Sequence, residues 1–82
     1  MKREEIAERV IKTTARELKL QPSEIKESDQ FAMELGADSL KSIELVAAFE
    51  EEFDLSVIEE DALKVQSVGA AIDFFDSIIN KK

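Results

Sequence analysis

The chain contains no cysteine, histidine, tryptophan or tyrosine, and these absences exclude several kinds of chemistry. Without cysteine it can form neither a disulfide nor a thiolate metal site, and without histidine it has no imidazole ligand. Nucleophilic catalysis by a Ser-His or Cys-His pair is excluded for the same reason. Any thiol chemistry needs a thiol brought in from outside, and we do not expect the chain to be an enzyme.

Long apolar runs are also missing, so we expect no membrane-spanning segment. The first residues, Met-Lys-Arg-Glu-Glu, lead into no apolar stretch, which predicts no secretory signal and a cytoplasmic protein. The chain has 82 residues, and residues 1–82 are expected to form a single domain. Hydrophobic residues make up 44% of the chain, with only two glycines and one proline, and this composition favours a compact helical fold.

Basic residues are scarce in the second part of the chain. Residues 1–30 contain seven Lys/Arg and seven Asp/Glu, whereas residues 31–82 contain four and twelve, which accounts for the whole net charge of −8. An acidic surface repels nucleic-acid phosphates and anionic lipid headgroups, so we expect neither nucleic acid nor a membrane as a partner. It suits basic protein surfaces, although acidity that only keeps the protein soluble is the simpler interpretation from charge alone.

Hydrophobic periodicity predicts four helices, over roughly residues 2–18, 39–53, 56–64 and 67–80. In the first helix, Thr13 and Thr14 fill the weak middle of the apolar stripe. Residues 56–59 match a capping box and suggest the start of the short third helix, although such a match often arises by chance. Ser67 is the expected cap of the last helix.

Residues 19–38 form a long predicted loop between the first two helices, with a helical turn near residues 23–26. Its expected anchors to the core are Leu20, Ile25, Phe31 and Leu35. Lys81 and Lys82 are expected to complement the dipole of the last helix. The predicted fold is therefore all-α: a four-helix bundle with one short third helix and a long loop between helices one and two.

The predicted helix over residues 39–53 carries two apolar stripes. The first is expected to face the core and consists of Leu45, Val46, Phe49 and Phe53. The second consists of Leu40, Ile43 and Ala47. This second stripe is flanked by Glu44, Glu50 and Glu51. Exposed apolar side chains between carboxylates indicate a docking surface for a basic partner, but the long loop covering Leu40 and Ile43 is an equal alternative. Glu52 is expected on a solvated face.

Ser39 stands where this helix begins, three residues after Gly36. Asp38 or Ser39 is the expected helix cap, and capping alone is a sufficient explanation for most such pairs. A hydroxyl at this place also lies in the positive field of the helix N-terminus, which favours a covalently attached phosphate group. Gly36 can adopt positive φ, which would let the loop turn sharply and leave Ser39 open to a modifying enzyme.

The motif Leu-Gly-Ala-Asp-Ser-Leu at residues 35–40 resembles the acyl carrier proteins. The similarity continues through residues 43–46, 50–53, 59–62 and 67–73, and so covers essentially the whole chain. It implies that Ser39 receives 4'-phosphopantetheine from coenzyme A through a phosphopantetheinyl transferase, which engages Asp38 with its metal ion. The arm would end in a thiol that carries acyl groups as thioesters, which fits a chain without cysteine.

The resemblance also implies roles for the helix over residues 39–53. Its recognition face, which docks on basic patches of acyl-processing enzymes, would comprise Leu40, Ile43, Glu44, Ala47, Glu50 and Glu51. The space that shelters the acyl chain would be lined by Leu45, Val46, Phe49, Ala62, Leu63 and Ile72. The resemblance further implies a monomeric carrier in fatty acid or related lipid or polyketide biosynthesis.

Three positions depart from the family pattern. Lys41 stands where many members have an acidic or small polar residue, Ala47 where many have a larger apolar one, and Ile58 where typical fatty-acid carriers have proline. Two other functions stay open from the residues alone. One is a helical interaction module without a prosthetic group, and the other is an acidic metal-binding domain that uses the carboxylates of residues 50–61.

Overall fold

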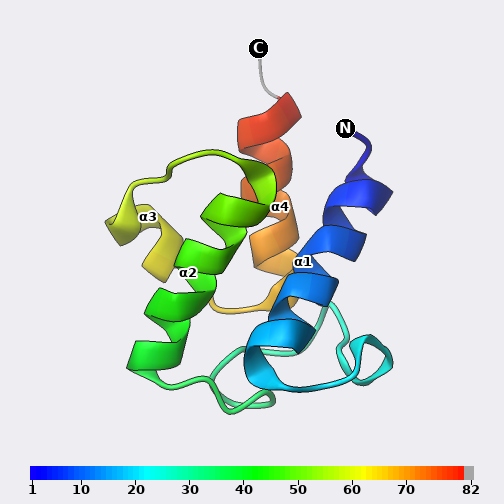
Figure 1. Ribbon diagram of the computed structural model, residues 1–82, viewed down its shortest axis with the longest axis vertical. Coiled ribbons are helices and arrows are strands. Elements are labelled where there is room, and N and C mark those ends of the chain that lie inside the picture. Colours follow the sequence, from blue (N-terminus) through cyan, green and yellow to red (C-terminus); the bar gives the residue numbers. More distant parts are fainter. Residues whose placement is uncertain (81–82) are drawn as a thin grey trace.

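The computed structural model describes residues 1–80, which form four α-helices and a short 3₁₀ turn (Figure 1). The elements are α1 (Arg3–Leu18), η1 (Pro22–Glu24), α2 (Ser39–Phe53), α3 (Glu59–Leu63) and α4 (Val68–Asn80). The predicted all-α bundle with a short third helix and a long loop after the first helix is confirmed. The expected contribution of Lys81 and Lys82 to the last helix lies outside the described residues.

The long helices α1, α2 and α4 form the bundle, and α1 runs opposite to the other two (Figure 1). Helix α1 packs against both α2 and α4, while α3 packs against α2. The loop over residues 19–38 crosses one end of the bundle, and the chain's N-terminus and the end of α4 lie at the other end. None of the helices within residues 1–80 combines the length and the hydrophobicity that a bilayer crossing needs.

The core stripe of α1 includes two threonines, as predicted. Ile6 and Val10 are fully buried, and Thr13 and Thr14 are buried to the same degree one turn further on. The hydroxyl oxygen of Thr14 has no hydrogen-bond partner among the described residues. A buried polar group without a partner loses its hydration and gains nothing in return, so this hydroxyl is a local cost to stability.

The long loop is held in place by side chains and by backbone hydrogen bonds. Ile25 and Phe31 are buried, and Leu20 and Leu35 pack against the core, so the four predicted anchors are confirmed. The amide of Phe31 donates to the backbone carbonyl of Gln66 (2.9 Å). The amide of Val68 donates to the backbone carbonyl of Asp29 (3.0 Å), and the amide of Gly69 to that of Glu27 (2.8 Å). These bonds clip the loop to the segment between α3 and α4, which the sequence pattern did not indicate.

The helix starts show where local sequence signals hold and where they do not. The predicted cap of α4 is confirmed, because Ser67 Oγ accepts a hydrogen bond from the amide of Ala70 (3.1 Å). The capping box at residues 56–59 is wrong: α3 begins at Glu59 with Ile58 at the N-cap, and no side chain caps it. The residues before α3 are held from α2, where Glu50 Oε2 accepts from the amide of Val57 (2.9 Å).

Glu52 does not lie on a solvated face, contrary to the prediction. Its carboxylate is partly buried and pairs with the guanidinium of Arg9 on α1, at 3.7 Å between Glu52 Oε2 and Arg9 Nε. Helix α2 turns about 100° per residue, and α1 packs along the side that Glu52 occupies. The helical pattern alone could not predict this, because the position of α1 around α2 is set by the whole bundle.

Candidate functional site

The chain turns into α2 at Gly36, which has a φ of 73° as the sequence predicted. Its neighbour Ala37 is buried, and the amide of Ala37 donates to the carbonyl of Phe31 (2.7 Å). A side chain at Gly36 would meet open space, so the glycine is required for its backbone conformation and not for lack of room. The turn brings the chain from the core to the surface within the three residues that precede Ser39.

Asp38, and not Ser39, caps α2. The Asp38 side chain accepts a hydrogen bond from the amide of Lys41 (2.9 Å), and its backbone is extended, as an N-cap requires. Ser39 is the first helical residue, and its side chain is exposed. Within residues 1–80 no hydrogen bond engages the Ser39 hydroxyl, which leaves this group free for chemistry.

The start of α2 fits an esterified phosphate. The amides of Ser39 and Leu40 have no hydrogen-bond partner within the described part of the chain, and the positive end of the helix dipole lies beside the Ser39 hydroxyl. Asp38 opposes this field with its negative charge, but its carboxylate already accepts from the Lys41 amide. The residues present can therefore hold a phosphate group on Ser39 without losing the helix cap.

The second apolar stripe of α2 is uncovered. Leu40 is 65% exposed and Ile43 is 46% exposed, and Ala47 continues the exposed line one turn further on. The alternative that the long loop covers this stripe is wrong, because the Leu40 and Ile43 side chains are exposed.

The predicted docking carboxylates differ in their surroundings. Glu44 and Glu51 are exposed beside the stripe, whereas Glu50 is half-buried and its carboxylate holds the Val57 amide. A shallow, open depression lies where α2 ends. It is bordered by Ala47, Glu50, Glu51, Asp54, Leu55 and Ser56. Within residues 1–80 no three acidic side chains come together in a way that could hold a metal ion.

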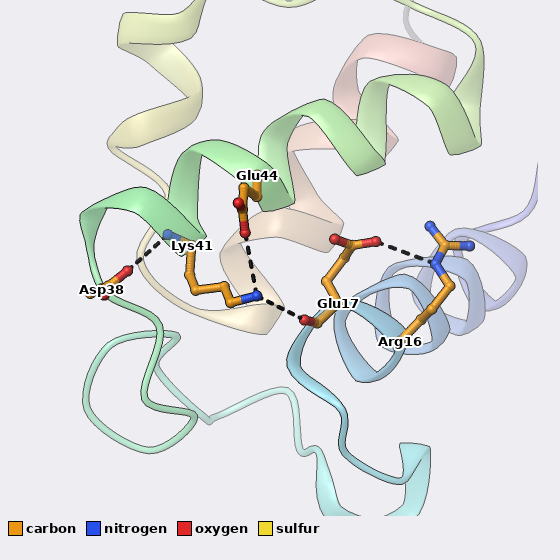
Figure 2. A network of polar contacts seen from close by, with 5 residues as sticks. All are labelled: Arg16, Glu17, Asp38, Lys41 and Glu44. Carbon is orange, nitrogen blue, oxygen red and sulfur yellow. Dashed lines mark hydrogen bonds and ion pairs between the residues drawn. The ribbon is translucent and has the colours of Figure 1, made fainter.

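Lys41 forms a small polar network at the start of α2 (Figure 2). Its ammonium group lies 3.3 Å from Glu44 Oε1 and donates to the backbone carbonyl of Glu17, at 3.5 Å, near the end of α1. Arg16 pairs with the Glu17 side chain beside it (3.4 Å). Lys41 therefore joins the beginning of α2 to the end of α1, and it offsets part of the charge of Glu44. The sequence indicated a positive charge at this position but not its partners.

An apolar cavity of about 50 Å³ lies among α2, α3 and α4. Five of the six residues expected around an acyl chain border it: Leu45, Val46, Phe49, Ala62 and Leu63. Ile72 is fully buried in the core but does not border the cavity. Sequence reasoning missed several lining residues, among them Phe31, Ser42, Val65, Phe74 and Phe75. Phe74 and Phe75 are adjacent aromatic residues in an apolar helix, and this pattern was the available signal.

The comparison with known families agrees with this geometry. Residues 8–75 match the family model described as phosphopantetheine attachment site. The match covers well over half of the 82 residues and includes the Gly36 turn, all of α2 and the lining of the cavity. Proteins of this family are carriers that hold 4'-phosphopantetheine and that do not themselves catalyse the reactions of their cargo. The chain therefore belongs to the family of phosphopantetheine-carrying carrier proteins.

Proposed function

We propose that Ser39 is the attachment residue and that the chain presents acyl groups, as thioesters on its 4'-phosphopantetheine arm, to partner enzymes. The observation that carries the proposal is the exposed Ser39 hydroxyl at the first position of α2, which is not used as the helix cap. The match to the phosphopantetheine family supports it, because the matched region includes this residue. The arm would supply the thiol that the chain itself lacks.

Attachment at Ser39 is a phosphoryl transfer. The Ser39 oxygen would form a bond to the phosphorus next to the pantetheine half of coenzyme A, and the adenosine 3',5'-bisphosphate half would leave. The hydroxyl proton would pass to a base supplied by the transferase. On the carrier side, Asp38 keeps the first turn of α2 formed and so holds the Ser39 oxygen at the surface.

The exposed stripe of α2 is the proposed docking surface for the transferase and for acyl-processing enzymes. Leu40 and Ile43 would supply apolar contact, and Glu44 and Glu51 would attract a basic patch. The depression beyond Ala47 has acidic side chains on its border and could receive a Lys or Arg side chain of the partner. A small surface with a charged rim suits fast exchange among several enzymes.

The cavity among α2, α3 and α4 is the proposed shelter for the acyl chain. It is bordered mainly by apolar side chains, and Ser42 on its rim lies one helical turn after Ser39. An arm on Ser39 could therefore turn back along α2 toward this opening.

We place the protein as a cytoplasmic monomer in fatty acid or related lipid or polyketide biosynthesis, where the acidic α2 suits separate partner enzymes.

Intact-mass spectrometry tests the attachment site. The protein is incubated with coenzyme A, magnesium and a broad-specificity phosphopantetheinyl transferase. The wild type should gain the mass of one phosphopantetheine, and Ser39→Ala should gain nothing. Ser42→Ala is the matched control, because Ser42 lies on the same helix one turn away and should leave loading intact. Failure of the wild type with several transferases would instead favour a helical interaction module without a prosthetic group.

A further inference from the structure

The cavity among α2, α3 and α4 has a rim and a closed end. Leu63 is 44% exposed, and Ser42 and Val46 are partly exposed, so these three residues form the rim. The closed end consists of the lining residues that are nearly inaccessible to solvent: Phe31, Leu45, Phe49, Ala62, Ala71 and Phe75. A chain that entered past Ser42 would therefore meet the rings of Phe49 and Phe75.

Phe75 contacts three other aromatic rings at and behind this closed end. The Phe75 ring centre lies 5.4 Å from that of Phe49, 5.2 Å from that of Phe74 and 5.0 Å from that of Phe53. Edge-on and stacked contacts of this kind add to the stability that buried area alone provides. Displacing Phe75 would break all three contacts together, whereas an aliphatic side chain could make room by changing rotamer.

The volume of the cavity limits what it can hold. A cavity of roughly 150 Å³ in another protein holds a six-carbon ring. By that ratio, the cavity of about 50 Å³ holds roughly two carbon atoms. A butyryl group would place its last two carbons inside and leave its carbonyl at the rim. A longer chain would have to separate the aromatic rings or keep its end in water.

We propose that Phe49 and Phe75 restrict the sheltered cargo of this carrier to short acyl groups of about four carbons. This inference rests on the proposed function, since it concerns the chain carried on Ser39. Longer acyl groups can still be attached, but the atoms beyond the fourth carbon gain no protection from the bundle. Enzymes that handle such short groups, or that shield the end of a longer chain themselves, are the class of partner that fits.

The test loads the protein with acetyl, butyryl, hexanoyl and octanoyl arms, using the corresponding acyl-coenzyme A and the transferase, and measures each unfolding temperature. Each methylene that becomes buried should raise the unfolding temperature by roughly 3–6 °C. We expect a rise from acetyl to butyryl and no further rise to octanoyl. A steady rise through octanoyl, or no dependence on length, would overturn the inference. Failure of every arm to attach would instead overturn the proposed function.

Two variants separate the closed end from the rest of the core. The limit is the acyl length beyond which the unfolding temperature stops rising. Phe75→Leu or Phe49→Leu should move this limit from butyryl to hexanoyl or longer. Ile6→Val is the control, because Ile6 is fully buried on α1 but does not border the cavity, and its limit should stay at butyryl. An identical limit in all three folded variants would contradict the role of the two rings. The wild-type series decides the cargo length even where a variant does not fold.

Discussion

Stability measurements can test whether Asp38 caps α2 and Ser39 does not. Asp38→Ala removes the side-chain acceptor that holds the Lys41 amide at 2.9 Å. Loss of an N-cap costs about 1 kcal/mol, and loss of the carboxylate from the positive end of the helix adds about 0.3–1 kcal/mol. We therefore expect a loss of about 1–2 kcal/mol. Ser39→Ala should change stability by no more than about 0.5 kcal/mol, because the Ser39 side chain is exposed and makes no hydrogen bond within the described residues.

Urea unfolding followed by far-ultraviolet circular dichroism measures both effects, since the chain has no tryptophan or tyrosine for fluorescence. Asp38→Asn keeps an acceptor oxygen and should lose only the charge contribution, about 0.3–1 kcal/mol. The ordering Ser39→Ala, Asp38→Asn, Asp38→Ala by increasing loss is the expected result. If Ser39→Ala lost as much stability as Asp38→Ala, Ser39 would be the cap, and its hydroxyl would not be free for attachment.

Three further predictions concern the turn, the core and the docking surface. Gly36→Ala should lower the free energy of unfolding by about 1–2 kcal/mol, because φ is 73° at this position. An unchanged urea midpoint would contradict the need for glycine there. Thr14→Val should raise stability by about 1–3 kcal/mol, because it removes a buried hydroxyl without a partner; a lower midpoint would show that the hydroxyl is satisfied. Glu44→Lys should lower kcat/KM for transferase loading up to about fivefold, and Glu24→Lys on η1 should not; equal effects would place the docking surface elsewhere.

Lys41 lies beside the docking surface, and its ammonium group is paired within the chain. Its ammonium group lies between Glu44 and the end of α1, so it is engaged within the chain. A basic partner residue that approaches Glu44 would compete with Lys41 for the same carboxylate. Both side chains are partly exposed, and such pairs contribute little in water, so Lys41 would adjust the choice of partner without preventing docking.

The sequence by itself determined the three long helices and the candidate attachment residue. Apolar spacing, the Gly36 turn and the Asp38-Ser39 pair are local signals, and the predicted limits of α2 coincide with Ser39–Phe53. The limits of the other long helices lie within one residue of the prediction, because the apolar spacing and the capping residues that mark helix limits are local in the chain. The motif around Ser39 could be recognised from the sequence for the same reason, because its residues are adjacent in the chain.

Only the tertiary structure decided how side chains from different helices meet. It turned Glu52 toward Arg9, engaged Glu50 with the Val57 amide and left the Leu40 stripe uncovered. It also gathered Phe49, Phe74 and Phe75 around the cavity and stacked Phe53 on Phe75. Helical periodicity gives the direction of a side chain around its own axis, but not which neighbour lies there. That neighbour depends on the packing of all the helices together.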